Sequence, residues 1–513
     1  MQTPTLRLDG QSLTLEDLQP LARGFDCRLE VSEEVYAGLQ PSREMVEGCL
    51  ERGEAVYGIS TGFGKLKSVA VAPGDLEELQ RNLVLSHSVG VGAPLAQHEV
   101  RIAQVLRLNS LLRGVSGIRP SLARELVELF NRGFVPEVPG QGSVGASGDL
   151  APLSHMVAAY MGFGFARVGG ERMDARTALD IIDMKPMRLS AKEGLALING
   201  TEVMKAIAVC NVLRARNLSK AADAVLALTI EARFGSARPF QERLAELKAN
   251  DGQSRTAYNV RACLQDSEVL ASHAGCGRVQ DPYSLRCAPQ IHGAFKSALQ
   301  HVEELVRAEL NAVTDNPIVD PVTASVYSAG LFHGQPLAVT QDYLALSLCS
   351  IANVSERRIE QLVNPDLSGL PGFLTPRPGL HSGFMIAQYT AAALASENKP
   401  LAHPASADSI PTSANQEDLV SMGMTAVRKA RTILDHTERI VGIEWLCAAQ
   451  GREFQLDLRA GKGAQAAYDQ LRKRVAPLVE DRYLAPDLEQ AAHLVASGEL
   501  VRAVEQAVGP LRA

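Results

Sequence analysis

The stretch EVMKAIAVCNVLRARNLSKAADAVLALTIEARF, residues 202–234, decides the fold class. It contains no Pro and no Gly, and its apolar residues recur every three to four positions, which is the spacing of an amphipathic helix. Similar segments, free of Pro and nearly free of Gly, occur at 294–313, 337–363, 418–441 and 487–507. Several exceed ordinary globular length, so they predict helices packed in a bundle or an oligomer core. Alternating β patterns are scarce apart from short pieces such as Thr5 to Leu8, and the predicted fold class is mainly α.

Dense loops alternate with these helical segments, and loops held by a rigid scaffold commonly carry functional residues. They cover residues 57–64, 139–149, 273–293, 314–336, 364–382 and 403–416. A soft boundary near residues 200–220 separates a loop-richer N-terminal part from a helix-dominated remainder. We therefore predict an N-terminal domain at 1–215 and, at 216–513, a long-helix central bundle with a C-terminal helical region.

The composition bears on partners and location. The 513-residue chain carries a net charge of -7 and has a pI near 5.9, and it offers no basic stripe to neutralise nucleic-acid phosphates. The N-terminus, MQTPTLRLDGQSLTLEDL, lacks a charged start followed by an apolar run, and no stretch of about eighteen uncharged apolar residues occurs. We expect no secretory signal, no nucleic-acid or membrane partner, and a cytoplasmic location.

The cysteines and histidines bear on disulfides and metals. The eight cysteines, at 27, 49, 210, 263, 276, 287, 349 and 447, form no CxxC pair, which fits free thiols in a reducing compartment. The only His-Glu pair, His98-Glu99, is followed by Val-Arg-Ile and lacks the second histidine of a metalloprotease helix. We expect no metal site.

Residues 142–149, GSVGASGD, contain a triplet, Ala146-Ser147-Gly148, that can cyclise on its own backbone. The amide nitrogen of Gly148 would attack the carbonyl carbon of Ala146, an approach that any side chain at position 148 would hinder. Loss of two waters, one from the ring and one from Ser147, leaves the 4-methylidene-imidazole-5-one group, MIO. This group is an electrophile that no side chain provides, and it needs no external cofactor. Asp149 and the apolar stretch after it indicate a helix that begins just past the turn.

This turn also has blander interpretations, of which the first is an ordinary glycine-rich loop. A phosphate-binding P-loop is rejected because it needs Lys-Ser/Thr after the last glycine, where this chain has Asp149-Leu150. A hydrolase nucleophile elbow is rejected because Ser147 is followed at once by Gly148. A serine hydrolase in which His155 activates Ser147 is a further alternative, although no acid partner is recognisable.

Eight loops and loop edges carry a resemblance to a known family. They are YGISTGFG at 57–64, LVLSH at 83–87, GSVGASGDLAPLSH at 142–155, LALINGT at 195–201, QDPYSLRCAPQ at 280–290, NAVTDNP at 311–317, NPDLSGLPGFLTPRPGLHSGFMIAQ at 364–388 and HPASADSIPTSANQED at 403–418. In this order and spacing they resemble the aromatic amino acid ammonia-lyases, most closely the histidine-specific members. The resemblance spans about residues 50–450.

The resemblance implies a fold and a reaction. The fold is a long-helix bundle of the ammonia-lyase/fumarase type with a loop-rich N-terminal domain that bears the MIO group. The reaction is the non-oxidative conversion of L-histidine to trans-urocanate and ammonia, the first step of histidine degradation, in a homotetramer whose active sites draw on three subunits. Because a β-hydrogen is a very weak acid and an amine a poor leaving group, an electrophile must capture the amine before a base can act.

The resemblance also assigns roles to matched residues. Tyr57 matches the base for the β-proton, which requires a pKa well below the free value near 10. Glu417 matches the active-site carboxylate, and His87 matches a histidine near the substrate imidazole. Arg286 matches the clamp on the substrate carboxylate, which its planar guanidinium suits. The remaining substrate-binding candidates are Asn199, Gln280, Tyr283, Phe332 and Gln416.

These residues also have structural alternatives. Ordinary packing would account for Tyr57, His87 and Phe332, a solvated surface charge for Arg286, and a turn for Asn199. Ser413 and Gln416, three residues apart, fit a helix capping box, after which Glu417 would complement the helix dipole.

Three positions depart from the family pattern. Asparagine is usual where Leu331 stands, histidine is common at Leu419, and glutamine is usual at Glu202. These changes leave the ring-forming residues intact and bear on substrate choice. The alternatives are an MIO-dependent tyrosine or phenylalanine ammonia-lyase, a 2,3-aminomutase that returns the amine to the β-carbon and, outside the enzymes, a helical scaffold in which the triplet stays uncyclised.

Overall fold

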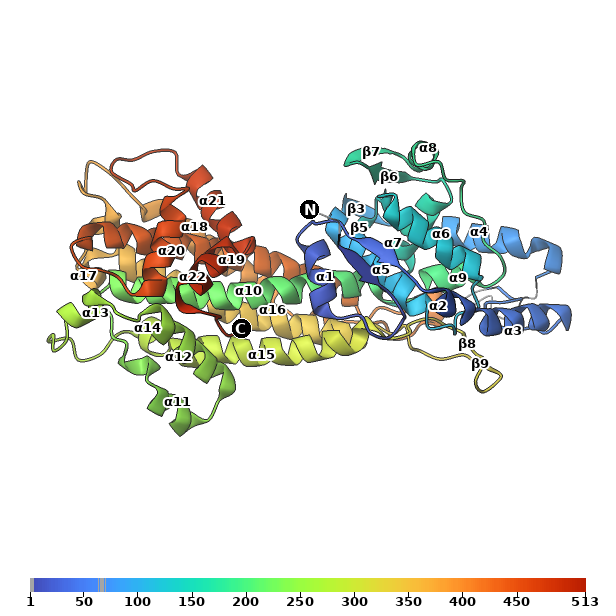
Figure 1. Cartoon of the computed structure of the whole chain (residues 1–513), viewed down its shortest axis with the longest axis horizontal. Helices are drawn as coiled ribbons and strands as arrows, with labels where there is room; N and C mark the ends of the chain where they lie inside the picture. The colour runs from blue at the N-terminus through green and yellow to red at the C-terminus, as the bar shows by residue number, and fades with distance from the viewer. Residues whose placement is uncertain (1–3, 63, 65–68, 70) are drawn as a thin grey trace. The chain divides into compact units, whose positions relative to one another are not determined.

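The computed structural model describes residues 4–62, 64, 69 and 71–513, so Phe63 of the predicted 57–64 loop lies outside the described residues. The described chain is mainly α-helical, as predicted, with a few short strands (Figure 1). It divides into a first unit, Met1–Cys210 with Glu304–Gln341 and Pro404–Arg428, and a second unit, Asn211–Glu303 with Asp342–His403 and Lys429–Ala513. This division differs from the predicted one at residue 215, because two later segments belong to the first unit.

Short helices and strands make up most of the first unit. Before residue 202 they are β1 Thr5–Arg7, α1 Leu15–Ala22, β2 Arg28–Glu30, α2 Glu33–Ala37, α3 Gln40–Glu51, the 3₁₀ helix η2 Pro73–Asp75, α4 Leu76–His87, β3 Val91–Pro94, α5 Gln97–Leu111, α6 Pro120–Asn131, β4 Val135–Pro136, β5 Pro139–Gln141, α7 Leu150–Tyr160, β6 Phe165–Val168, β7 Glu171–Asp174, α8 Ala175–Ile181 and α9 Glu193–Ile198. Later come β8 Ile318–Asp320, β9 Ser325–Tyr327 and the 3₁₀ helices η5 Ala405–Ala407 and η6 Ser413–Asn415. The strands pair as β1-β2, which is parallel, and as β3-β5, β4-β6-β7 and β8-β9, which are antiparallel.

The core of the first unit is made of helices that are buried on almost every side. Helix α5 is buried from Glu99 to Leu111, and α4, α7 and α9 pack against one another (Figure 1). Helix α7 is apolar around most of its circumference, as expected for a helix without a solvent face. The predicted ring-forming turn ends where α7 begins, so this packing fixes its position.

Four long helices contain boundaries between the units. They are α10 Glu202–Ala232, α15 Ala288–Leu310, α16 Gln335–Val363 and α19 Gly423–Arg452. The first three match the helices predicted at 202–234, 294–313 and 337–363. The helix predicted at 418–441 starts later, because Met422 has a left-handed φ of 54° that a helix does not accommodate. The helix predicted at 487–507 is wrong as a single helix, because Gly498, with a φ of 77°, divides it.

The second unit is a helical body. Its elements besides the long helices are the 3₁₀ helix η3 Arg238–Phe240, α11 Glu242–Lys248, α12 Asp251–Cys263, α13 Glu268–Ser272, α14 Tyr283–Arg286, α17 Pro365–Ser368, the 3₁₀ helix η4 Gly372–Leu374, α18 Met385–Leu401, the 3₁₀ helix η7 Glu453–Gln455, α20 Lys462–Arg472, α21 Ala485–Ala496 and α22 Glu499–Val508. Helix α20 packs against α22 and α12. The fully buried Trp445 of α19 donates its indole N–H to the carbonyl of Ala467 at 3.2 Å, which anchors α20 in this core.

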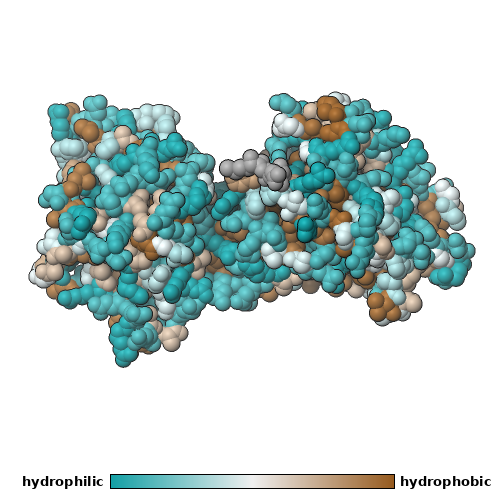
Figure 2. Space-filling view, in the orientation of Figure 1, coloured by the Kyte–Doolittle hydropathy of each residue, from teal (hydrophilic) through white to brown (hydrophobic). Residues whose placement is uncertain are grey.

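The face of the chain in Figure 2 is mostly hydrophilic. On the face shown in Figure 2, hydrophobic residues occupy small separate patches. Among the described residues, α16 alone has the length and hydropathy of a membrane span, and 61% of its most apolar window is buried, as in a core helix. No group of three or more metal-ligating side chains lies together in the described chain, and all eight cysteines are free thiols.

Candidate active site

The glycine-rich turn at 142–149 lies in the first unit, and its three glycines have left-handed backbone angles. The φ values are 126° at Gly142, 73° at Gly145 and 74° at Gly148. A residue with a Cβ rarely adopts such angles. A Cβ at Gly148 would also overlap the carbonyl oxygen of Gly200. Position 148 therefore admits glycine alone, which is the residue that ring closure requires.

The turn is held bent by its neighbours. The Ser143 hydroxyl accepts a hydrogen bond from the amide of Gly145 at 3.2 Å and donates one to the carbonyl of Gly148 at 3.2 Å. Ala146 is buried in an apolar cluster that is completed by Ala338, Ala405, Val420, Met422 and Ala426. Apolar packing around Ala146 and the hydrogen bonds of Ser143 thus both hold the triplet in place.

Helix α7 begins at Leu150, directly after the turn, as predicted. The carboxylate of Asp149 does not cap α7 but accepts a hydrogen bond from the amide of Met204, at the start of α10, at 2.8 Å. Burial raises the pKa of Asp149 to about 7, against the opposing effect of the Met204 amide. The N-terminal ends of α7 and α10 therefore both adjoin the turn, and both favour negative charge there.

A buried ion pair adjoins Gly200, the residue whose carbonyl oxygen lies against Gly148. Glu202, one of the departures from the family pattern, lies 2.7 Å from Nη1 of Arg107, and its other oxygen accepts from the Thr314 hydroxyl at 2.5 Å. Burial alone would raise the pKa of Glu202, but Arg107 and Lys205 hold it below its usual value. A Cβ at Gly200 would overlap both partners of the pair, so the pair sets the position of Gly200.

Glu417 lies beside the triplet. Its Oε1 accepts a hydrogen bond from the Ser147 hydroxyl at 3.4 Å, and its Oε2 accepts one from the Thr412 hydroxyl at 2.7 Å. The backbones of positions 412 and 417 also pair with each other. This pairing directs the Glu417 carboxylate toward Ser147.

The capping-box interpretation of the preceding segment is wrong. Ser413, Ala414 and Asn415 have φ values of 50°, 50° and 64°, and α19 starts only at Gly423. Three successive left-handed residues with a Cβ are unfavourable, and such strain is retained where neighbouring structure imposes it. Gln416 is exposed and follows the 3₁₀ helix η6 instead of standing in the first turn of an α-helix.

Tyr57 is half-buried, and its pKa is shifted in the direction opposite to the expected one. Burial raises the pKa of Tyr57, and the carboxylates of Glu417 and Asp315 raise it further, while a hydrogen bond from the Gly64 backbone opposes them. The expectation of a lowered pKa is therefore wrong for the described chain, because the charges that act on this hydroxyl are negative. A Cβ at Gly64 would lie 2.7 Å from Oγ of Ser413, so the Tyr57 loop rests on the loop that carries Glu417.

His87 is the last residue of α4 and is half-buried. Its Nδ1 lies 3.1 Å from the hydroxyl of Ser86. Burial lowers the pKa of His87, against the opposing effects of the Leu83 backbone and Glu417. Its imidazole is therefore neutral near pH 7, and it couples electrically to the same carboxylate as Tyr57.

Two further predicted residues belong to the first unit. Asn199 is 2% exposed; its Nδ2 donates to the carbonyl of Asn316 at 2.8 Å, while its Oδ1 has no hydrogen-bond partner among the described residues. Phe332 is half-buried, and Nε2 of the adjacent His333 lies 3.2 Å from the carbonyl oxygen of Leu419. The segments that contain two of the family departures, positions 331 and 419, thus lie together.

Gln280, Tyr283 and Arg286 belong to the second unit, whereas the triplet belongs to the first. Gln280 is exposed, and Tyr283 is 66% exposed. The guanidinium carbon of Arg286 lies 4.4 Å from the ring centre of Tyr283, and its Nε donates to the carbonyl of Asp281 at 2.9 Å. Arg286 and Tyr283 thus contact each other.

The geometry contradicts the hydrolase alternative. Nε2 of His155 accepts a hydrogen bond from the amide of Gly90 at 2.9 Å, and burial lowers the pKa of His155. The Ser147 hydroxyl is bonded to Glu417 instead. His155 is thus engaged elsewhere and does not activate Ser147.

Sequence reasoning missed several residues that support the site. Thr412 and Arg107 were not singled out, and neither were Lys192 and Asp315, whose side chains form a buried ion pair at 2.6 Å. A usable signal was present for Arg107, a charge flanked by Val105, Leu106 and Leu108. Such charges are rarely buried unless they are paired.

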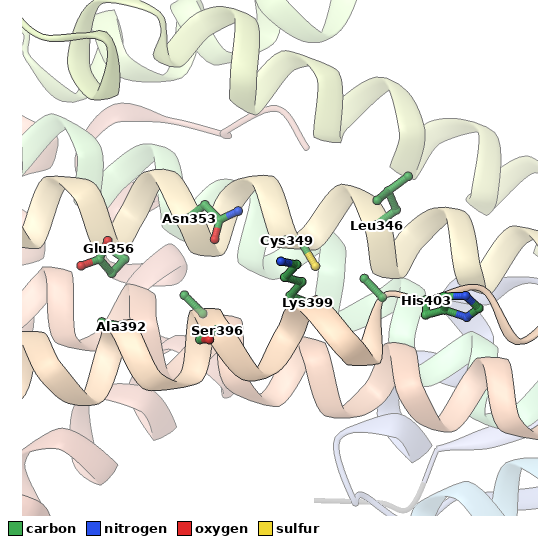
Figure 3. Close-up of a pocket in the computed structure, with 10 residues that line it drawn as sticks. Leu346, Cys349, Asn353, Glu356, Ala392, Ser396, Lys399 and His403 are labelled. Carbon is green, nitrogen blue, oxygen red and sulfur yellow. The ribbon is translucent and has the colours of Figure 1, made fainter.

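A groove of about 590 Å³ in the second unit contains none of the predicted site residues. It lies between α16 and α18, with Cys349 and Asn353 on one helix and Ser396 and Lys399 on the other (Figure 3). The candidate chemistry is therefore not in this groove but at the turn of the first unit.

A sequence profile of the aromatic amino acid lyases matches residues 13–473, which include the triplet and every predicted site residue. The chain belongs to the aromatic amino acid lyase family. Within this family, a histidine ammonia-lyase from Alkaliphilus oremlandii is 50% identical to it over 98% of this chain and 99% of its own.

Solved structures of the family share the fold. The crystal structure of histidine ammonia-lyase from Trypanosoma cruzi matches with a TM-score of 0.91 at 40% identity, over 98% of this chain and 96% of that one. Tyrosine aminomutase from Streptomyces globisporus matches with a TM-score of 0.93 at 36% identity, over 99% and 100%. The predicted mainly α fold of the ammonia-lyase type is confirmed.

Proposed function

We propose that the chain is a histidine ammonia-lyase, a carbon-nitrogen lyase that converts L-histidine to trans-urocanate and ammonia as the first step of histidine degradation. One observation carries this proposal. A triplet able to cyclise is bent in a turn that admits only glycine at position 148, and its serine lies 3.4 Å from Glu417. The full-length similarity to histidine ammonia-lyases supports the choice of substrate.

The MIO group would form from Ala146, Ser147 and Gly148. The residues fit it, because the space beside Gly148 is closed by the Gly200 carbonyl and the amide of Asp149 already donates to that carbonyl at 2.6 Å. Once formed, the group supplies an electrophile that makes the substrate amine a leaving group.

The chain's own side chains would bind the substrate and move its proton. Glu417 would hold a cationic group of the substrate, and the neutral His87 would hydrogen-bond the imidazole. Tyr57 would accept the β-proton. A cation beside Glu417 would offset one of the two carboxylate charges that raise the pKa of Tyr57, and so would favour its use as a base.

We further propose a homotetramer in which Gln280, Tyr283 and Arg286 complete the site of a neighbouring subunit. The contact between Arg286 and Tyr283 and the exposure of Tyr283 and Gln280 support this. Tyr57→Phe and Arg286→Met, expressed together, should regain part of the activity that each lacks alone, because some mixed sites combine both native residues. Failure of the mixture to exceed either variant would contradict shared sites.

We propose a cytoplasmic location, which the eight free thiols support because a reducing compartment keeps thiols unpaired. Cell fractionation in the native host tests this. Recovery of the activity outside the cytoplasmic fraction would contradict it.

A substrate panel tests the main proposal. The purified chain, without additives, should convert L-histidine to an ultraviolet-absorbing product, and its intact mass should lack two waters. A second candidate, ammonia removal or 2,3-migration on tyrosine or phenylalanine, is favoured by the exposed apolar Leu331 and Leu419, whose segments lie together. A preference for tyrosine over histidine in competition would establish that candidate instead.

A further inference from the structure

Residues 315–317, which join α15 to β8, hold two separate parts of the proposed active site. The carbonyl of Asn316 accepts the hydrogen bond from Asn199 at 2.8 Å. The side-chain Oδ1 of Asn316 accepts another from the amide of Ala329 at 2.8 Å, three residues before Phe332. Asn316 thus fixes the side chain of Asn199 and the backbone at Ala329, which leads to Phe332.

The same segment also supports the loop of the proposed base. A Cβ at Gly58, next to Tyr57, would lie 3.0 Å from Cδ of Pro317 and 2.5 Å from Cδ2 of Leu195. The backbone therefore approaches Pro317 closely, and Gly58, with a φ of 74°, allows that approach. A shift of Pro317 would move the Tyr57 loop.

A buried ion pair fixes this segment. Nζ of Lys192 lies 2.6 Å from Oδ2 of Asp315, and both side chains are completely buried. The other oxygen of Asp315 accepts the amide of Asn316 at 2.7 Å. Lys192 itself has a left-handed φ of 72° immediately before α9, the helix that Asn199 directly follows.

Stability alone does not account for such a pair. Burying two charges costs about as much as their attraction returns, and apolar residues often serve equally well. A buried pair is of use where it specifies one geometry. Here the pair ties the start of α9 to residues 315–317, so it controls the distance between Asn199 and Asn316.

We propose that Lys192 and Asp315 are positioning residues for the deamination: their ion pair holds residues 315–317 in the one place that aligns Asn199, Phe332 and Tyr57. This inference rests on the proposed function, in which Tyr57 is the base. The pair also bears on Tyr57 electrically. Among the described residues, the charges that act on its hydroxyl are Glu417 and Asp315, and Lys192 neutralises Asp315 from behind.

Asp315→Asn is the first test. It keeps the shape of the side chain and removes a negative charge that faces Tyr57, together with both effects of Asp315 that hold the buried Lys192 in its charged form. We expect kcat to fall on the order of 10- to 100-fold through misplacement. The rising limb of kcat/KM against pH, which reports the free base, should move to lower pH by roughly one unit.

Lys192→Met is the opposing test. It leaves the negative charge of Asp315 uncompensated, so kcat should also fall but the same limb should move to higher pH. The double variant Lys192→Met/Asp315→Asn also lacks the Asp315 charge, so its limb should lie at lower pH than the native limb, near that of Asp315→Asn, while kcat stays low. Opposite shifts of the single variants are an electrostatic signature that a loss of folding does not produce.

Arg119→Met is the matched control, since Arg119 pairs with the buried Glu193, the residue after Lys192, at 2.7 Å. It should lower stability and leave the limb in place. Intact mass should show the two-water deficit in all variants, which separates positioning from ring formation. A native chain inactive on histidine, tyrosine and phenylalanine contradicts the proposed function. An active native chain whose single variants share one shift, or none, overturns the positioning role.

Discussion

The turn at 142–149 and the segment at 280–286, which includes the short helix α14, carry the two halves of the proposed chemistry, and they are constructed in opposite ways. In the turn, Gly148 and Asp149 are buried, and their contacts tie them to α10 and to Gly200. In the segment at 280–286, Tyr283 is 66% exposed, and Arg286 contacts Tyr283 and Asp281 of the same segment. The buried residues of the turn are enclosed by the first unit, whereas the side chain of Tyr283 is exposed.

This difference follows from what each half must do. A ring that forms from the backbone needs a fixed, water-poor turn, because the attacking nitrogen and the carbonyl carbon must be held together. Groups that bind a substrate need access to it. The electrophile is thus a property of the folded unit, while substrate binding depends on what the exposed segment at 280–286 contacts.

Gly148→Ala should break the enclosed half most severely. The added Cβ overlaps Gly200 and requires an unfavourable backbone angle, so the ring should not close. We expect activity to fall at least roughly 10⁴-fold, because the electrophile is lost. Mass spectrometry of the intact chain should show both waters retained.

Gly164→Ala is the control for that variant. Gly164 has a φ of 75°, nearly that of Gly148, but a Cβ there would meet nothing within 4 Å. It should therefore lose some stability and keep the ring. Equal loss of the ring in both variants would show that backbone angle, not the Gly200 contact, is decisive.

The buried Asp149 should make the enclosed half pH-dependent. Its pKa is raised from 3.8 to about 7 in the folded chain, so the folded state keeps a proton that the unfolded state releases. The contribution to stability is full at acidic pH and is lost as the pH rises through 7. Relative to Asp149→Asn, the free energy of unfolding of the native chain should fall by about 3 kcal/mol between pH 5 and pH 8. Urea unfolding at both pH values measures this, and a constant difference would contradict it.

Arg286→Lys should break only the exposed half. A lysine cannot replace the planar two-point grip on a carboxylate, so kcat/KM should fall about 100-fold, chiefly through KM. The ring and, within about 0.5 kcal/mol, the free energy of unfolding should be retained. Arg278→Lys, in the same loop region, is the matched control and should be near native. Loss of the two-water deficit in Arg286→Lys would show that ring formation depends on Arg286, and would contradict the separation of ring formation from substrate binding.

The sequence predicts the enclosed half better than the exposed one. Helical periodicity, the glycines of the turn and the start of α7 are local properties, and they are found where expected. The break at Gly498 was missed because the apolar spacing continues on both sides of it. The left-handed turn at 413–415 was missed because local propensity favoured a capped helix, whereas the backbone pairing of positions 412 and 417 imposes the turn.

Pairings between distant residues are beyond such reasoning. Glu202 could be noted as unusual, but its partner Arg107 lies 95 positions away. The raised pKa of Tyr57 likewise depends on Glu417 and Asp315, which the fold alone brings near. Residue types predict which chemistry is available, and tertiary contacts decide the charge state in which it operates.

His87→Gln should have the smallest effect on activity. His87 is half-buried, so its exposure lies between that of the buried Asp149 and that of the exposed Tyr283. We expect KM for histidine to rise about tenfold through one lost hydrogen bond, with little change for tyrosine as the internal control. The pH effect has the opposite sign to that of Asp149. Since burial lowers the pKa of His87, its contribution to stability is present above about 6.5 and is lost as the pH falls through the lowered value. Removing His87 should therefore abolish a rise of stability with pH below about 6.5, whereas removing Asp149 should abolish a fall of stability as the pH rises from 3.8 to about 7; slope changes of the same sign in both variants would contradict one of the two assigned pKa shifts.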